Sequence, residues 1–594
     1  MKHFKWAQLL LAAVLTAGLA NCGLAGSSSP KTPPTPPTIT AISLSPQNSA
    51  VTIGHNVQLQ AMATLSDGSQ SDVSSTASWA SSNTGLATVQ GGLVKGTSPG
   101  VVEIQAASGA VSATTLLNVT SKAFSNASLS GRYAFTLTSN TAQGLKVEAG
   151  SISADGSGNV TGTEDVNAAG SVSTNVSVHG AYSVTRDGRG TLTLNSSGQP
   201  SRTLRFVLAA NSGAAGDNDG SLVEFDTSAT ATGTLRKQDI SAFQNSALSA
   251  STYVFRWGGL DTGHNPSAAV GLFTTDAAGA NVASGEEDLN DNGTINDGTS
   301  SSTPVSITGG TIANLDSSTG RATLTVNANG HTSNFAVYVC SAAKLNLIGL
   351  DSSTVLAGVA EKQASPAPTS VAAGGYVFHS EIGNTAGQFW IMGQFQLDNT
   401  SHVISLTQYQ DGGITLSIVN PAGTVSITSK GRGALVENTS DGARNFTIYM
   451  VSATQMYLLE TDDAHAACGA GEMQQPGPDG FGVATLNNSL ALSAAEIGDG
   501  NVAFVAGVVA DGLGNLQGIE DVTRPQAGNP SKLTTSSVAF VAAYGVPQAN
   551  GVTVANVSTA QTGIQALALF FIAPNKALVV GLSPSDVTGA VGLQ

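Results

Sequence analysis

Short stretches in which apolar and polar residues alternate recur along most of this chain. Leu204, Phe206 and Leu208 alternate with Arg205 and Val207, and large apolar residues again occupy every second position at Phe335, Val337 and Val339. Successive side chains of a strand point to opposite faces, so this alternation predicts strands with a buried face. Turns rich in Gly, Asn and Asp separate the stretches, and the chain is therefore predicted to be all-β.

A longer pattern recurs four times after residue 128 and ends on Gln each time, at Gln238, Gln363, Gln475 and Gln594. It combines a Tyr-x-Phe opening, a turn that begins with Asp, a Gly-x-Glu-Asp segment and a Gly-Arg segment, although the third and fourth copies each lack some of these parts. A repeat of this length is a whole small domain, because solenoid repeats span about 20 to 50 residues. The predicted domains cover residues 128–238, 245–363, 370–475 and 481–594.

Each copy is predicted to hold eight short strands and no helix. In the first copy the strands are centred on residues 133–137, 146–154, 160–165, 176–184, 190–194, 203–208, 222–226 and 231–236. Such a series favours an antiparallel meander that closes as a small barrel, which removes exposed strand edges, with a two-sheet sandwich as the alternative. An eight-stranded barrel is either filled by its own side chains or holds one small ligand. The short linkers between copies predict contact between neighbouring domains.

Residues 1–22 have the parts of an export signal: Lys2 and Lys5, an apolar stretch, and small residues before Cys22. The apolar stretch is shorter than the roughly 20 residues that span a bilayer. The ending Leu-Ala-Asn-Cys resembles a bacterial lipobox, and this resemblance implies that Cys22 carries a lipid anchor, with Gly23 favouring the outer membrane. An ordinary secretory signal with an incidental cysteine is the alternative. Residues 23–37, rich in Ser and Pro, are predicted to form an extended spacer.

Residues 38–120 form the next predicted domain. Val57-Gln-Leu-Gln-Ala61 alternates as a half-buried strand, Asp67-Gly68 indicates a hairpin, and Trp79 is a candidate core residue between two sheets. With Gly91-Gly-Leu-Val-Lys-Gly96, these residues resemble the bacterial Ig-like group 2 domain in order and spacing. The resemblance implies a β-sandwich of the kind found as spacers and adhesive units on bacterial surface proteins.

Charge and cysteine content exclude several classes of protein. Only 10% of the residues are charged, the net charge is −16 and the pI is near 4.8. Nucleic-acid binding requires clustered Lys and Arg, so no nucleic-acid partner is expected. Three cysteines without a Cys-x-x-Cys pair give neither a disulfide framework nor a metal site, and Cys340 is interpreted as a small buried apolar residue.

The acidic turn of the second copy is the strongest candidate metal site. Asp288, Asn290 and Asn292 followed by Gly293 match the start of a calcium-binding loop, but Thr299 stands where the bidentate acid belongs. A polar hairpin is the competing interpretation. Calcium is therefore a weak hypothesis, no other cofactor is expected, and the turns at Asp155 and Asp511 are weaker candidates still.

Two Gly-Arg-Gly segments centre on Arg189 and Arg432, where a local carboxylate is the expected partner and an acidic glycan the alternative. The adjacent Glu-Asp pairs, such as Glu164-Asp165, face opposite sides of a strand and cannot act together as an acid and a base. We therefore expect no catalytic residues and no enzyme. The sequence favours an exported, lipid-anchored protein of the cell envelope with a structural or adhesive role, held to the membrane by its anchor and binding glycan or another surface protein. A carrier of small apolar ligands and a hydrolase with an unrecognised site are the alternatives.

Overall fold

The computed structural model describes most of the chain from residue 36 to residue 591. The described ranges are 36–121, 123–141, 143–209, 219–227, 229–261, 263–296, 303–328, 330–382, 390–410, 414–416, 418–428, 430–439, 442–461, 466–496, 502–526, 529–559, 565–583 and 586–591. The export signal, Cys22 and Gln594 lie outside these ranges. Among the described residues, no helix has the length and apolar character needed to cross a bilayer.

The N-terminal domain is a β-sandwich whose strands form three small sheets, ordered β1-β4-β5, β2-β10-β9-β6 and β3-β8-β7. Leu59 and Ala61 are fully buried while Gln58 and Gln60 are exposed, as the alternation predicts. Trp79 is partly buried, contacts the two apolar clusters of the domain and donates its indole N–H to the Ser74 carbonyl at 2.9 Å. The strands are β1 (Ile39–Ser45), β2 (Ser49–Thr52), β3 (Asn56–Gln58), β4 (Gln60–Leu65), β5 (Gln70–Asp72), β6 (Ser78–Ser81), β7 (Ala87–Gln90), β8 (Leu93–Gly96), β9 (Gly100–Ser108) and β10 (Val111–Thr120).

Barrel 1 is a closed ring of eight antiparallel strands, each paired with its neighbour in sequence. Its strands are β11 (Ser130–Thr141), β12 (Gly144–Asp155), β13 (Asn159–Ala168), β14 (Ser171–Val184), β15 (Arg189–Ser196), β16 (Arg202–Leu208), β17 (Gly220–Glu224) and β18 (Thr230–Lys237).

Barrel 2 closes in the same way through pairing of β20 with β21, and a short strand, β22, pairs antiparallel with the end of β21. Its strands are β19 (Thr252–Asp261), β20 (Pro266–Thr275), β21 (Asn281–Asp291), β22 (Thr294–Ile295), β23 (Val305–Ala313), β24 (Arg321–Ala328), β25 (His331–Ser341), β26 (Lys344–Gly349) and β27 (Thr354–Lys362).

Barrel 3 is closed by a bridge between His402 of the β29–β30 turn and Thr424 of β32, and β31 pairs with β30. Its strands are β28 (Gly374–Ile382), β29 (Trp390–Leu397), β30 (Val403–Gln410), β31 (Ile414–Leu416), β32 (Ile418–Ile427), β33 (Arg432–Thr439), β34 (Gly442–Ser452), β35 (Gln455–Glu460) and β36 (Ala467–Met473).

Barrel 4 is again a closed ring of eight strands. Its strands are β37 (Ser489–Glu496), β38 (Val502–Ala510), β39 (Asn515–Gln526), β40 (Asn529–Tyr544), β41 (Val552–Thr559), β42 (Ala566–Ala573), β43 (Lys576–Ser583) and β44 (Asp586–Val591). The predicted all-β fold, with a sandwich followed by repeated barrels, is confirmed, and the barrel form is the one adopted. Short 3-10 turns precede the first strands of barrels 1, 2 and 4: Asn126–Ser128, Ile240–Ala242, Asn245–Leu248 and Val483–Thr485.

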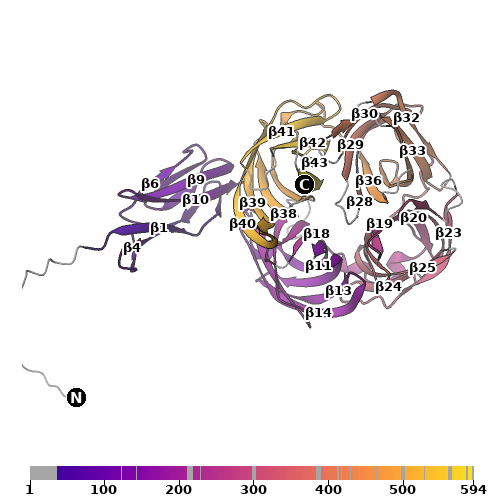
Figure 1. Cartoon of the computed structure of the whole chain (residues 1–594), viewed down its shortest axis with the longest axis horizontal. Coiled ribbons are helices and arrows are strands. Elements are labelled where there is room, and N and C mark those ends of the chain that lie inside the picture. Colours follow the sequence, from indigo (N-terminus) through magenta and orange to yellow (C-terminus); the bar gives the residue numbers. More distant parts are fainter. Residues whose placement is uncertain are drawn as a thin grey trace, which may run out of the picture.

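The four barrels lie around a common centre, with barrel 4 beside barrel 1 (Figure 1). Apolar side chains on the outer faces of the barrels are buried between neighbours, so contact occurs at all four junctions. The junction of barrels 1 and 4 buries Val207, Ala209 and Val223 of barrel 1 against Ala491, Ala503 and Val505 of barrel 4. The chain therefore forms a closed ring of barrels, and the contact expected from the short linkers is present.

The N-terminal domain binds the ring where barrels 1 and 4 meet. Asn48 links it to both barrels: its carbonyl accepts from the Arg189 guanidinium at 2.8 Å, and its amide donates to the Ser537 carbonyl at 3.3 Å. A second contact joins the Val101 N–H to the Gln517 side chain of barrel 4 at 3.1 Å. These contacts hold the two sequence-distant barrels to a common third domain.

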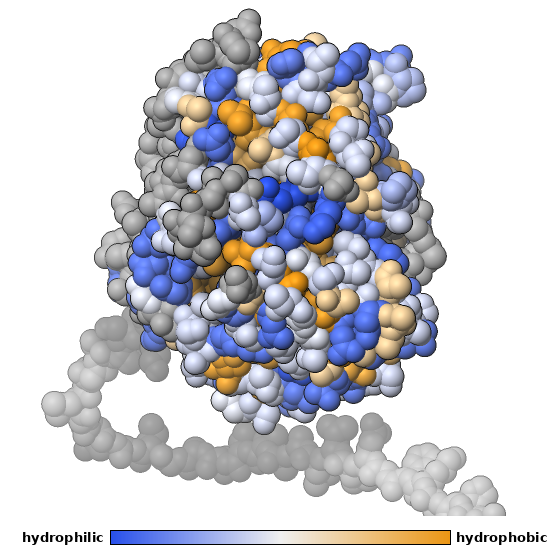
Figure 2. Space-filling view, turned by 90° about the vertical axis from the view of Figure 1, so that its right-hand side faces the viewer, coloured by the Kyte–Doolittle hydropathy of each residue, from blue (hydrophilic) through white to orange (hydrophobic). Residues whose placement is uncertain are grey.

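The outward face of barrels 2 and 3 shows small hydrophobic groups scattered among polar ones (Figure 2). Scattered apolar residues of this kind are normal on a water-exposed surface. The large apolar contacts of the ring are thus at the junctions between barrels.

Candidate functional site

The repeated Glu-Asp pair places one carboxylate inside a barrel and the other between barrels. Glu164 is fully buried in barrel 1, where its carboxylate binds Arg202 at 2.6 Å. Asp165, the next residue on β13, points out of barrel 1 and binds Arg321 of barrel 2. The sequence-based prediction that the two side chains face opposite sides is therefore confirmed for this pair.

The junction of barrels 1 and 2 is centred on a buried cluster of Asp165, Arg321 and Tyr338. Arg321 donates from Nε and Nη2 to the two oxygens of Asp165, both at 2.7 Å, and the Tyr338 hydroxyl donates to the same carboxylate at 2.5 Å. The hydrogen bond to Asp165 raises the pKa of Arg321, and burial followed by the Asp165 charge raises the pKa of Tyr338 well above 10. Such a bidentate contact fixes the relative orientation of the arginine and the carboxylate as well as their distance.

The junction of barrels 2 and 3 repeats this cluster with Asp288, Arg432 and Tyr449. The three corresponding contacts are each 2.8 Å long. Burial opposes the charge of Arg432, but the hydrogen bond and charge of Asp288 outweigh it and raise the pKa of Arg432. The partner of Arg432 is thus a carboxylate of the protein, as predicted, and it belongs to the preceding barrel.

The junction of barrels 3 and 4 has apolar residues at the corresponding positions. Strand register places Tyr409 where the other copies have Asp, and Val552 where they have Arg. Phe570 replaces the Tyr, and its ring meets that of Tyr409 edge-on with centroids 5.8 Å apart. All three members of the polar cluster have changed together, so no charge is left buried without a partner.

At the junction of barrels 4 and 1, an aspartate of one barrel again lies beside an arginine of the next. Asp521 of barrel 4 lies 3.7 Å from Arg189 of barrel 1, while Arg189 also donates from Nε to Asp187 at 2.8 Å. Asn118 of the N-terminal domain donates to Asp187 at 3.2 Å. Burial opposes ionisation of Asp187, but Arg189 and these hydrogen bonds lower its pKa. Here the predicted local carboxylate is present, together with one from another barrel.

A glutamine at the end of a barrel extends into the next one. Gln238 donates to the carbonyls of Thr319 and Val339 at 3.1 and 2.7 Å. Gln363 makes the corresponding contacts in barrel 3, at 3.0 and 2.9 Å. At the third junction Gln474 occupies this position, with contacts of 2.9 and 2.7 Å, rather than the adjacent Gln475 that the repeat pattern selects. The repeated glutamine therefore has a physical role in joining barrels.

The three calcium candidates lie in the same hairpin but have other contacts. Asp288 is bound by Arg432 and Tyr449, and Asn290 donates to the Glu460 carbonyl of barrel 3 at 3.0 Å and accepts from Gly293 N–H at 2.8 Å. Asn292 has a φ of 50°, as tight turns require. A cation at Asp288 would have to displace Arg432, so this geometry opposes the calcium hypothesis. The part of the chain that the structure describes contains no group of three or more His, Cys, Asp or Glu residues able to hold a metal.

The weaker candidates, Asp155 and Asp511, are bound by their own turns. Asp155 accepts from the backbone N–H groups of residues 157, 158 and 159 and from the Asn159 side chain. These hydrogen bonds, that of the Asn159 side chain first, lower the pKa of Asp155. Asp511 makes the same kind of contacts with Leu513 and Asn515. Both are structural Asp turns.

The interiors of barrels 1 and 3 each contain an Arg among carboxylates. In barrel 1, Arg202 binds Glu148 as well as Glu164. In barrel 3, Arg444 lies 3.4 Å from Glu460, and Glu437 is fully buried with neither carboxylate oxygen hydrogen-bonded. Burial raises the pKa of Glu437 to about 8, with Arg444 lowering it and Glu460 raising it.

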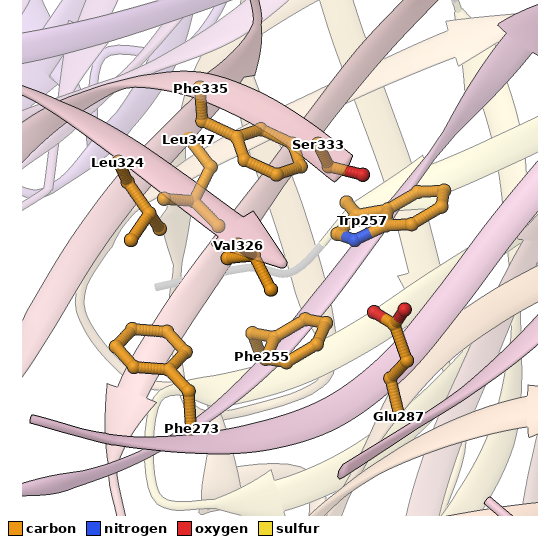
Figure 3. A pocket seen from close by; sticks show the side chains of 9 residues that line it. All are labelled: Phe255, Trp257, Phe273, Glu287, Leu324, Val326, Ser333, Phe335 and Leu347. Atoms are coloured by element: carbon orange, nitrogen blue, oxygen red, sulfur yellow. The ribbon is translucent and has the colours of Figure 1, made fainter. Parts of the chain in front are cut away.

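The interior of barrel 2 contains a cavity lined mostly by apolar side chains, four of them aromatic (Figure 3). The volume open to the centre of a water molecule is about 10 Å³, which is room for a single water. Glu287 supplies a buried carboxylate, and His331 lies 2.8 Å from it with one third of its side chain exposed. That contact raises the pKa of His331 in spite of burial. The lining residues are Phe255, Trp257, Phe273, Glu287, Leu324, Val326, Ser333, Phe335 and Leu347.

The strands that are buried on both faces, inside a barrel and against its neighbour, were not predicted, although the sequence contains a signal for them. Residues 502–510 read Val-Ala-Phe-Val-Ala-Gly-Val-Val-Ala, and every one of them is buried. Such a continuous apolar run marks a strand covered on both sides. Cys340, predicted to be a small buried apolar residue, lies 4% exposed in the apolar junction of barrels 1 and 2, and burial raises its pKa to about 11.

Residues 38–119 match the model of the bacterial Ig-like domain (group 2), so this segment belongs to that family. Over 89 residues the chain is 38% identical to ice-binding protein 1 of Shewanella frigidimarina, a match that covers 15% of this chain and 10% of that protein. Transferrin binding protein B from Neisseria meningitidis aligns over 63% of this chain and 82% of its own, with 12% identity and a TM-score of 0.15. Domains 4–9 of the surface layer protein SbsC align over 85% and 82%, with 11% identity and a TM-score of 0.14. At these TM-scores neither structure supports an argument about this chain.

Proposed function

We propose that this chain is a non-enzymatic protein of the bacterial cell surface, held by a lipid on Cys22, whose ring of barrels is a rigid platform for binding a glycan or another surface protein. The observation that carries the proposal is the set of buried contacts at all four junctions. A ring closed by apolar surfaces and bidentate ion pairs holds the loops of its barrels in fixed relative positions. That arrangement suits multivalent binding, in which affinity depends on the spacing of sites.

The family of residues 38–119 supports the location. Domains of this family serve as spacers and adhesive units on bacterial surfaces, and the Ser- and Pro-rich residues 23–37 would hold the ring away from the membrane. The N-terminal domain contacts barrels 1 and 4 directly, so a tether attached to it would orient the whole ring.

The two alternative functions receive less support. A carrier of apolar ligands needs a cavity of about 300 to 1,000 Å³, whereas the barrel 2 cavity admits about one water. A hydrolase needs converging acid, base and nucleophile. The interior carboxylates Glu164 and Glu287 are instead bound to Arg202 and His331.

The test combines location with binding. The full chain and its Cys22→Ala variant are expressed in a bacterial host, labelled with radioactive palmitate and treated with protease on intact cells. The proposal predicts label and surface proteolysis for the unmodified chain and no label for the variant. The purified ring is then screened against glycan arrays and surface protein extracts. A chain that is unlabelled and retained inside the cell, or a ring that hydrolyses a substrate in the screen, would overturn the proposal.

A further inference from the structure

Alignment of the barrels by strand register reveals one position at which barrel 2 departs from its neighbours. In barrel 1 Leu194 pairs with Arg202, and in barrel 3 Glu437 pairs with Arg444. The corresponding pair in barrel 2 is Val326 with Ser333. Barrel 2 has therefore replaced the interior arginine by a serine.

The acid that this arginine binds is retained. Glu164 of barrel 1 lies opposite Gly150, and Glu287 of barrel 2 lies opposite the equivalent Gly271. Glu164 binds Arg202 at 2.6 Å. Glu287 is just as deeply buried, at 2% exposure, and shares a cavity with Ser333. The cavity of barrel 2 thus opens where the guanidinium group lies in barrel 1.

The walls of this cavity suit a cation. The Glu287 carboxylate points toward the indole of Trp257, with Phe255 and the Ser333 hydroxyl nearby (Figure 3). Aromatic faces attract cations, and a buried carboxylate requires a positive partner. His331, at the partly exposed start of β25, lies 2.8 Å from Glu287 and supplies that partner when its ring is protonated.

We propose that the interior of barrel 2 is a binding site for a guanidinium-bearing small molecule, which takes the place that an arginine side chain fills in barrel 1. The guest guanidinium takes the place of the His331 ring and fills the water-sized space beside it. It donates hydrogen bonds to Glu287 and lies against Trp257. The site is reached past His331, whose ring is partly exposed. It is independent of the surface role proposed above, because it uses residues inside one barrel.

The test measures binding of methylguanidinium chloride to the full chain by calorimetry, with sodium chloride at equal ionic strength as the blank. The unmodified chain is expected to bind one equivalent saturably. Glu287→Gln removes the charge of the charge-assisted hydrogen bonds and is expected to weaken binding by about 10-fold or more.

Ser333→Arg is the matched control, because it restores the residue found in barrels 1 and 3. The new side chain is expected to bind Glu287, keep the barrel folded and abolish methylguanidinium binding. Thermal unfolding of both variants checks that the fold is retained. Absence of saturable binding to the unmodified chain, or binding that survives in folded Ser333→Arg, would overturn the proposal.

Discussion

Tyr409 of barrel 3 meets Phe570 of barrel 4 edge-to-face, with ring centroids 5.8 Å apart, at the position where the junctions of barrels 1 and 2 and of barrels 2 and 3 have an aspartate and a tyrosine. The third partner, arginine elsewhere, is Val552. One junction of the ring has thus exchanged a buried ion pair for an apolar contact. Replacement of a buried ion pair by apolar residues of similar volume is often neutral or stabilising, whereas loss of one partner is costly.

This relationship predicts that a polar junction and an apolar junction can replace each other only when all three residues of the cluster are changed together. Tyr409→Asp alone buries a carboxylate beside Val552 and should destabilise the junction by about 3 to 5 kcal/mol. The triple variant Tyr409→Asp, Val552→Arg, Phe570→Tyr should recover most of that loss. Hydrogen exchange of the β30 and β41 amides measures the free energy of opening. A triple variant as unstable as the single one would show that the positions are not equivalent.

Removal of one partner from a polar junction should also be costly. Asp288→Asn leaves Arg432 without its carboxylate and should lower the free energy of opening between barrels 2 and 3 by about 3 to 5 kcal/mol. Glu286→Gln is the matched control at the same junction. Glu286 binds Lys430 at 2.7 Å, but the Lys430 side chain is 61% exposed, so the loss should be within about 1 kcal/mol. Equal effects of the two substitutions would contradict the assignment of Asp288 as a junction residue.

The stability of barrel 3 should fall as pH rises, because Glu437 holds a proton in the folded state. Its pKa is raised by burial from 4.5 to about 8. Between these values the unfolded chain releases the proton and the folded chain retains it, so folding becomes less favourable with increasing pH, by about 1.4 kcal/mol per pH unit at most. Below 4.5 and above 8 this group adds no pH dependence.

Thermal unfolding of the full chain, measured at pH 5 and at pH 8, tests this expectation with Glu437→Gln as the comparison. Glutamine does not titrate, so the variant should lose the part of the pH slope that comes from barrel 3. Identical slopes for the unmodified chain and the variant would show that Glu437 is ionised in the folded state.

The sequence predicted the strands and the barrels because their signals are local. Alternation and turn residues specify each strand of a meander, and neighbouring strands pair in sequence order. The opposite orientation of Glu164 and Asp165 follows from strand geometry alone. The sequence did not predict that Asp165 binds an arginine of the next barrel, because that contact depends on how two closed barrels pack together.

The ring itself could not be predicted from any one copy. Its closure requires that the last barrel return to the first, and the residues involved, such as Arg189 and Asp521, are far apart in the chain. The Ser333 substitution was visible in the sequence, but its meaning depends on strand register. Only the paired positions identify Arg202 and Arg444 as its equivalents.

Closure of the ring is the central claim, and an engineered disulfide between barrels 1 and 4 tests it most directly. The hydroxyl oxygens of Ser221 and Ser493 lie 3.0 Å apart across this junction. Cysteines at both positions are therefore close enough for a disulfide. The Ser221→Cys, Ser493→Cys variant of the full chain should form an intramolecular bond under mild oxidation, seen as faster migration on a non-reducing gel and as a linked peptide pair by mass spectrometry. Each single variant should migrate unchanged. Thiols that stay reduced in the double variant, or that link only separate molecules, would contradict a closed ring.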